Sequence, residues 1–194
     1  DLIREEYALK VKEAHVAEQD RLYDLIQKQT EGQLKLLTEL TDRFDASESE
    51  DEKRRLLGKM VVIGAYLKRK SNLILLADKE PLLDAGEIAL TFRESLDNME
   101  LYGISCGFHS DIDGAVPAEC VMKLYDVFEN IVECALDKMQ AITVLITRKR
   151  AGLQMTVNTD ADADVNRLSS DFMKVSQDED GEWQITAYIG GESE

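Results

Sequence analysis

Three aspartates at alternate positions, Asp160, Asp162 and Asp164, directly follow a run of β-type residues at 153–159. Acids at the end of a strand can bind a metal ion, accept a hydrogen bond from a nucleotide base, or keep a loop solvated. The stretch lacks the central glycine and the final glutamate of an EF-hand loop, so the spacing does not predict that type of calcium site. Which of the remaining roles these acids have depends on the elements that surround them.

The composition indicates a folded protein that binds other proteins. The chain has 194 residues, 44% of them hydrophobic, which suits one large domain or two small ones with a real core. Its formal net charge is −16, with 39 acidic and 23 basic residues. Such a charge repels phosphate, so it argues against nucleic acid and anionic membrane surfaces as partners.

The cysteines and the hydropathy place the chain in a reducing compartment. Cys106, Cys120 and Cys134 form no CxxC pair, which predicts reduced thiols in a cytosolic setting. No apolar run is long enough to span a membrane. Because the sequence begins inside a helical pattern, we expect a fragment attached to a membrane only through a segment upstream of Asp1.

Residues 1–80 are predicted to form an antiparallel helical hairpin. Two stripes of residues repeat at steps of three and four, which places each stripe on one face of a helix. The acidic stretch DASESEDE at 45–52 is expected to separate the two helices. The first stripe contains Leu22, Ile26, Gln29, Gln33, Leu37, Leu40 and Phe44, and the second contains Leu57, Met60, Gly64, Leu67, Ser71 and Ile74.

The length of this hairpin predicts a homodimer. A second helix of some 25 residues would be about 40 Å long, too long to bury its stripe inside a small monomer. Two hairpins that pair into a four-helix bundle would bury both stripes. The alternative is a long hairpin that packs on its own C-terminal domain.

The rest of the chain predicts an α+β unit with helices on one face of a small mixed sheet. Residues 81–103 form a connecting helix, with Asp84 and Glu87 at capping-box spacing. A strand at 104–109 precedes a helix that opens at Pro117. The remaining elements expected are strands at 142–148 and 153–159 joined by a turn at 149–152, a short helix at 164–175, and a hairpin at 174–177 and 182–189.

This order of elements resembles the cytoplasmic part of bacterial sensor histidine kinases. In that family a dimerisation and phosphotransfer bundle, here residues 1–80, precedes an ATPase-like two-layer α/β sandwich of the gyrase and Hsp90 type, here residues 104–194. The stretches YLKRKSNLILLADKE at 66–80 and VPAECVMKLYDVFENIVECAL at 116–136 are similar to one branch of these kinases. The resemblance implies a role in two-component signalling with a response-regulator receiver domain as partner.

The resemblance also implies a nucleotide site, and the sequence departs from it. Glu129 matches a glutamate of the family's long helix, and Glu133 falls where the family has a magnesium-binding asparagine. A carboxylate can bind Mg²⁺ as an amide does, but the two could equally be a solvated i, i+4 pair. Asp160 matches the aspartate that binds adenine. The glycines that should follow it are replaced by Asp162 and Asp164, so we expect ATP and Mg²⁺ to be absent rather than bound.

The phosphoacceptor histidine implied by the resemblance is missing. The family pattern aligned on Gly32 and Gln33 places Lys28 and Gln29 at its His-Asp pair. His15 lies upstream on the first helix and is a remote candidate for phosphorylation, while His109 falls at the end of a strand. Catalysis by this chain is therefore in doubt.

Two functions from different classes remain open at this stage. The first is the signalling region of a membrane-anchored sensor histidine kinase with degenerate phosphoacceptor and ATP-binding motifs. The second is a non-catalytic dimeric adaptor, or phosphotransferase-like scaffold, that docks a response regulator. Two basic clusters, 68–70 and 148–150, are predicted to be solvated, with the first as an alternative docking surface for an acidic receiver domain.

Overall fold

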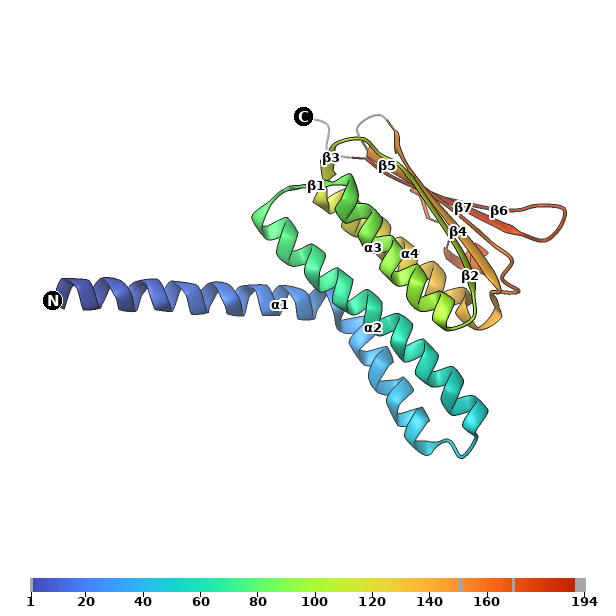
Figure 1. Ribbon diagram of the computed structural model, residues 1–194, viewed down its shortest axis with the longest axis horizontal. Helices are drawn as coiled ribbons and strands as arrows, with labels where there is room; N and C mark the ends of the chain where they lie inside the picture. The colour runs from blue at the N-terminus through green and yellow to red at the C-terminus, as the bar shows by residue number, and fades with distance from the viewer. Residues whose placement is uncertain (1, 150–151, 169, 191–194) are drawn as a thin grey trace.

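A computed structural model of the chain describes residues 2–149, 152–168 and 170–190. Its first two helices, α1 (Leu2–Ala46) and α2 (Glu50–Lys79), form the predicted antiparallel hairpin. Arg21 near one end of the hairpin pairs with Asp78, and Thr41 near the other end contacts Met60. In Figure 1 the first part of α1 projects away from the rest of the molecule and the second part packs along α2.

The connection between the two helices is shorter than the sequence indicated. Only residues 47–49 lie outside a helix, because the acids at 50–52 form the first turn of α2. Ser49 caps that turn by accepting a hydrogen bond from the Glu52 backbone N–H at 3.3 Å. Acidic side chains in a first turn favour the helix dipole, so a segment without apolar periodicity still starts a helix.

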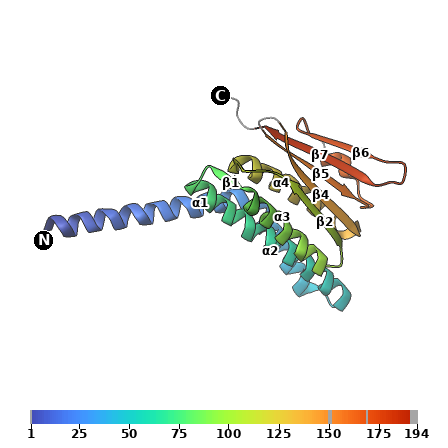
Figure 2. The ribbon, with the colours of Figure 1, turned by 45° about the horizontal axis from the view of Figure 1, so that its top comes forward.

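The C-terminal part is the expected α+β sandwich. Helices α3 (Ala85–Leu101) and α4 (Ala118–Ala135) cover one face of a five-stranded sheet, as Figures 1 and 2 show. Asp84 caps α3, since its side chain accepts from the Glu87 N–H at 2.9 Å, whereas the Glu87 carboxylate pairs with Arg69. Gly103 follows the helix with φ of 97°, a conformation that favours glycine.

The sheet is mixed, in the order β2-β4-β5-β7-β6. Strands β2 and β4 pair in parallel, and every other neighbouring pair is antiparallel. A separate two-stranded sheet of β1 and β3 joins the starts of α3 and α4, which the sequence did not predict. The strands are β1 (Leu82–Asp84), β2 (Ser105–Asp111), β3 (Ala115–Pro117), β4 (Ala141–Lys149), β5 (Gly152–Thr159), β6 (Met173–Gln177) and β7 (Trp183–Gly190).

The C-terminal helix is shorter than predicted. The helix expected at 164–175 is only a 3-10 turn, η2 (Val165–Leu168), and the last residues of that range belong to strand β6. Asp164 forms an Asx turn at its start, since its Oδ1 accepts from the Asn166 N–H at 3.2 Å, and this favours a short turn over a longer helix. The turn expected at 149–152 includes residues 150 and 151, which lie outside the described residues.

One hydrophobic core runs from the sheet through α3 and α4 to α2. Its centre is an aromatic cluster in which Phe92 contacts Tyr125, Phe128 and Phe108 at ring centroid distances of 5.4, 5.5 and 6.1 Å. Val62, Tyr66 and Leu73 of α2 belong to this core, whereas Leu56 and Ile63 pack with Leu40 of α1 in a second, smaller core. Helix α2 therefore packs on the sandwich with one side and on α1 with another.

No helix within the described part of the chain is both long and apolar enough to cross a membrane.

Candidate functional site

Helix α4 directs Glu129 and Glu133 toward the helical hairpin. The two residues are four apart and so lie on one helical face. Both line a cleft of about 120 Å³ between α4, α1 and α2. Glu133 accepts a hydrogen bond from Gln33 Nε2 of α1 at 2.9 Å, whereas Glu129 is buried with 1% of its surface exposed.

Glu129 is held in an environment that opposes its charge. Burial, followed by the nearby charges of Glu133 and Asp126, raises the pKa of Glu129 well above its ordinary value. Its Oε1 atom has no hydrogen-bond partner in the structure. Leu36, Leu40 and Ile63 contribute apolar side chains to the same cleft, so this carboxyl group favours its neutral form.

Glu129 and Glu133 share their cleft with two bases, Lys59 and Arg43. Across residues 2–149, 152–168 and 170–190, no group of three or more His, Cys, Asp or Glu side chains is placed to hold a metal ion. The magnesium-binding role that the resemblance implies for Glu133 stays a prediction.

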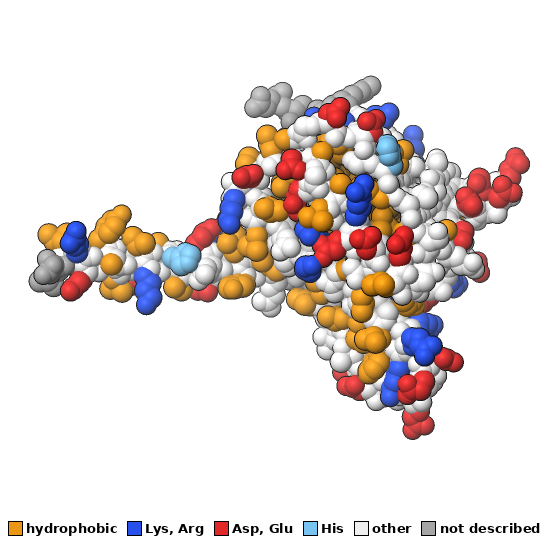
Figure 3. Space-filling view, in the orientation of Figure 1, with side chains coloured by type: hydrophobic (Ala, Val, Ile, Leu, Met, Phe, Trp, Pro, Cys, Tyr) orange, Lys and Arg blue, Asp and Glu red, His pale blue; other side chains and the backbone are white. Residues whose placement is uncertain are grey.

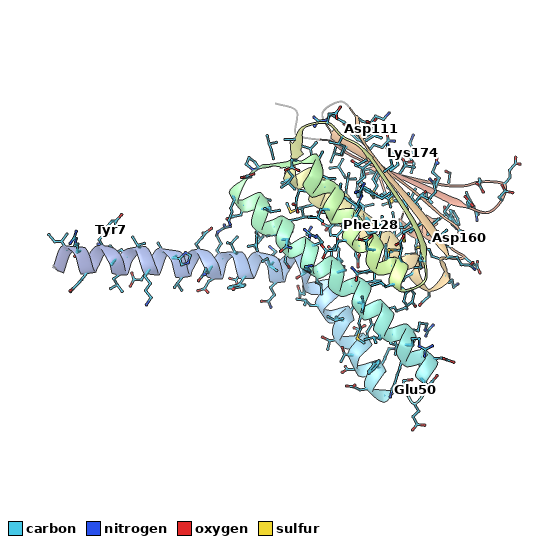
Figure 4. All side chains as sticks on the ribbon, in the orientation of Figure 1. Tyr7, Glu50, Asp111, Phe128, Asp160 and Lys174 are labelled. Carbon is cyan, nitrogen blue, oxygen red and sulfur yellow. The ribbon has the colours of Figure 1, made fainter. Side chains whose placement is uncertain are left out.

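Asp160 lies just after β5, at the end of the sheet where β4 begins. Its Oδ1 accepts hydrogen bonds from the backbone N–H groups of Gln140 and Ala141, both at 2.9 Å. Figure 4 labels Asp160 at one end of the strands and Asp111 at the other. Asp160 thus holds the end of β5 against the start of β4.

The other two aspartates also shape the loop that follows β5. The Asp162 N–H donates to the Lys138 carbonyl at 3.1 Å, and Asp164 closes the Asx turn described above. Cys134 at the end of α4 contacts the Asp164 carbonyl, with Sγ and O 3.8 Å apart, and accepts from Arg167 Nη2 at 3.3 Å. The Arg167–Cys134 contact had no signal in the sequence.

The residues matched to a nucleotide site make contacts in two different parts of the structure. Asp160 accepts hydrogen bonds from the backbone at the start of β4, whereas Glu129 and Glu133 line the cleft beside the hairpin. Their role toward Mg·ATP stays a prediction.

The candidate phosphoacceptors lie apart from these acids. His15 is exposed on the projecting part of α1, and His109 is exposed on β2. Lys28 and Gln29, which occupy the family's His-Asp positions, are exposed on α1. None of the four makes a described hydrogen bond or ion pair.

The prediction that residues 68–70 form a solvated basic cluster is wrong for two of the three. The Arg69 and Lys70 side chains are only 10% and 2% exposed. Arg69 pairs with Glu87 and Glu94 of α3, and Lys68 also pairs with Glu94. Three consecutive basic residues are typical of a solvated surface, and no local pattern indicates that α3 covers this side of α2.

Lys70 belongs to a buried polar cluster between α2 and α4. Its Nζ donates to Asp126 Oδ1 at 2.5 Å, and the Tyr66 hydroxyl donates to the same oxygen at 2.9 Å. Lys59 of α2 pairs with Asp137, just beyond the end of α4. Charged and polar contacts thus join α2 to both helices of the sandwich.

The outer face of the hairpin carries exposed apolar side chains. The α2 residues Leu57, Val61 and Leu75 are 51%, 41% and 38% exposed, and Leu34 of α1 is 42% exposed. Gly64 on the same face has nothing within 4 Å of where a Cβ would lie. Figure 3 shows hydrophobic side chains on the hairpin and along the projecting helix.

No protein-family model matches the chain, and no curated protein matches its sequence. Among solved structures the chain is similar to a bacterial phosphotransferase, with 8% identity, coverage of 84% of this chain and 91% of that one, and a TM-score of 0.44. It is similar to the histidine kinase domain of a blue-light activated histidine kinase from Erythrobacter litoralis, with 11% identity, coverage of 82% and 94%, and a TM-score of 0.45. For the histidine kinase AdeS of Acinetobacter baumannii the identity is 8%, the coverage 84% and 96%, and the TM-score 0.39. These likenesses assign no role to any residue of this chain.

Proposed function

We propose that this chain is a signalling module of histidine-kinase-like architecture that works by binding a partner and not by transferring phosphate from ATP. The observation that carries the proposal is the use made of Asp160, whose Oδ1 is engaged by the backbone of Gln140 and Ala141. The ion pairs from α2 to α3 and α4 also favour a hairpin and a sandwich that act as one unit.

Calorimetry with Mg·ATP tests this proposal against an active kinase. We expect no heat of binding, because Asp160, at the family's adenine position, already accepts two backbone hydrogen bonds, and Glu133, at the metal position, accepts one from Gln33. Circular dichroism of the same sample verifies that the protein is folded. Micromolar binding that Asp160→Asn abolishes would overturn the proposal and favour the catalytic alternative.

We propose further that the module is a homodimer, joined through the outer face of the hairpin. Support comes from the exposed side chains of Leu34, Leu57, Val61 and Leu75, which would be buried if two hairpins formed a four-helix bundle. Gly64 would allow close approach of a second helix at that face.

Sedimentation velocity of two matched variants tests the dimer. Val61→Asp places a charge on the outer face of the hairpin and should yield a monomer. Leu90→Asp makes the same kind of change at a residue of α3 that is 48% exposed, and it should leave the dimer intact. A wild-type monomer at high concentration would contradict this part of the proposal.

The proposed partner is the receiver domain of a response regulator, on the cytoplasmic side of a membrane-anchored receptor. The surface beside the start of α2 and the end of α3 offers a site for it, with Arg54 and Arg55 next to the exposed Leu101. Such a mixture suits an acidic partner with an apolar centre. The double variant Arg54→Glu, Arg55→Glu should weaken binding to the cognate receiver domain, and Lys12→Glu should not.

A further inference from the structure

The cleft between α1, α2 and α4 is lined by side chains of all three helices. Its volume is about 120 Å³. A cavity of about 150 Å³ in a protein core holds one benzene molecule, so the cleft between α1, α2 and α4 suits a slightly smaller molecule. Its apolar walls are formed by Leu36, Leu40, Val62, Ile63, Val132 and Leu136.

Glu129 is the polar group in this cleft that still needs a partner. Its Oε1 is buried and unpaired, and leaving such an atom unsatisfied costs about 1–3 kcal/mol. The other polar side chains of the lining are engaged. Glu133 accepts from Gln33, Lys59 pairs with Asp137, and Arg43 lies 3.6 Å from Glu52.

We infer that this cleft is a binding site for a small uncharged molecule that carries one amide or hydroxyl group on a branched alkyl body of about five or six non-hydrogen atoms. The polar group of the ligand would meet Glu129, and its alkyl part would meet Ile63, Val132 and Leu40.

The chemistry of the lining selects this class of ligand. A neutral carboxyl group has one hydrogen to donate and an oxygen that accepts, which matches an amide or a hydroxyl. The lining holds two acids, Glu129 and Glu133, and two bases, Lys59 and Arg43, so it attracts neither anions nor cations strongly. An ion would also lose its hydration on entering an apolar space.

Occupation of the cleft would act on the whole molecule, because its walls come from three helices. A ligand that binds the folded state alone stabilises that state by an amount that rises with the logarithm of the ligand concentration once this exceeds Kd. Here it would specifically strengthen the packing of α1 and α2 against α4. The inference does not depend on whether the chain binds ATP or forms a dimer.

An NMR titration of the full chain with isobutyramide tests the inference. With methyl groups labelled, we expect saturable shifts for Ile63, Val132 and Leu40, and intermolecular NOEs from these methyls to those of the ligand. Glu129→Leu should weaken binding about tenfold, since it removes the hydrogen bond, which corresponds to about 1.4 kcal/mol. Glu129→Gln keeps a donor and an acceptor and should retain binding.

Three results would overturn the inference. One is the absence of saturable shifts, which would mean that the cleft holds water only. Another is equal affinity in the wild type and Glu129→Leu. The third is a set of NOEs that places the ligand elsewhere on the molecule. Because the NOEs locate the ligand in the unmodified protein, the test does not depend on how well a variant folds.

Discussion

At the scale of single residues, burial decides what a carboxyl group can do. The residues Glu129 and Glu133 are one helical turn apart and have the same chemistry. Only Glu129 is enclosed, between α4 and the hairpin, and this burial raises its pKa well above the ordinary value. The enclosed residue is thereby suited to neutral hydrogen bonding, and its neighbour to a contact with Gln33 at the surface.

The raised pKa of Glu129 predicts a pH-dependent stability. The folded state holds this proton more tightly than the unfolded chain, whose value is near 4.5. The stabilisation is complete below that pH and is lost as the pH rises through the folded pKa, by up to about 1.4 kcal/mol per pH unit. Urea unfolding from pH 4 to 8 should therefore show Glu129→Gln gaining free energy of unfolding relative to the wild type as the pH rises. A difference that stays constant with pH would contradict the assignment.

Substitution of Asp160 is expected to change the free energy of unfolding. Asp160→Ala removes the acceptor for two backbone N–H groups at the start of β4 and should lower the free energy of unfolding by about 1 kcal/mol. Asp160→Asn keeps an oxygen at the same place and should change it by less than about 0.5 kcal/mol. Urea unfolding of both variants measures the difference, and equal losses would show that the carboxylate charge matters more than the acceptor.

At the scale of elements, the contact between α2 and α4 depends on a buried ion pair. Lys70 is enclosed and Asp126 is partly exposed, with side-chain exposures of 2% and 43%. Removing the acid leaves a buried ammonium group without its partner, whereas removing the base leaves a carboxylate that water and Tyr66 can still solvate. The two halves of the pair should therefore differ in cost.

A double-mutant cycle measures this asymmetry. Asp126→Ala should lower the free energy of unfolding by about 3 kcal/mol, and Lys70→Met by less than about 1 kcal/mol. The double variant should recover most of the loss, because no buried charge remains. Additive losses in chemical denaturation would mean that the pair is not coupled.

Alanine in place of Gly58 on α2 is expected to destabilise the protein, although alanine usually stabilises a helix relative to glycine. A Cβ at this position would lie 2.0 Å from Cδ2 of the Tyr102 ring, which packs across the helix. Gly58→Ala should therefore destabilise the protein by about 1–3 kcal/mol. Gly32→Ala on α1, where nothing lies within 4 Å, should instead stabilise it by about 0.5–1 kcal/mol. Thermal unfolding of the two variants tests the contrast.

Local signals in the sequence predicted most elements, and contacts between distant elements escaped them. The helix cap at Asp84, the helix after Pro117 and the alternating strands all depend on neighbouring residues, and the structure confirms them. Arg69 and Lys70 read as surface residues because their partners, Glu94 and Asp126, lie far along the chain. The stripe of α2 predicted one apolar face. It did not show that a second face of α2, with Val62 and Tyr66, packs on the sandwich.

The site was less predictable than the fold for the same reason. Glu129 was identified by its position in a helix, while its burial depends on Leu36 and Leu40 of a different helix. The resemblance matches Asp160 to an aspartate that binds adenine, and no residue near Asp160 in the sequence shows that the start of β4 lies beside its side chain. The aspartates that follow it are part of a loop that orders itself through backbone contacts.

At the scale of the whole molecule, α2 is shared between two hydrophobic cores. One core joins it to α1 and the other joins it to α3, α4 and the sheet. Separating the hairpin from the sandwich would expose the buried side chains of Val62, Tyr66 and Leu73 and break the ion pairs of Arg69 and Lys70. The hairpin and the sandwich should therefore unfold together.

Two optical probes test this cooperativity. The single tryptophan, Trp183, is buried in β7 and reports on the sandwich, whereas far-UV circular dichroism is dominated by the helices. Denaturation curves followed by the two signals should coincide. A hairpin that melts first, with the tryptophan signal unchanged, would contradict a shared core.

The projecting part of α1 has a further consequence. Every side chain from Ile3 to Arg21 is exposed, and the first half-buried residue is Leu22. A helix of that length with no neighbour is marginal in water, because its nucleation is costly and no packing offsets it. Its first turns should fray rapidly in hydrogen exchange, with protection beginning where Arg21 meets Asp78. A partner that orders or unfolds this projecting helix would therefore first affect the part of the hairpin where Arg21 pairs with Asp78.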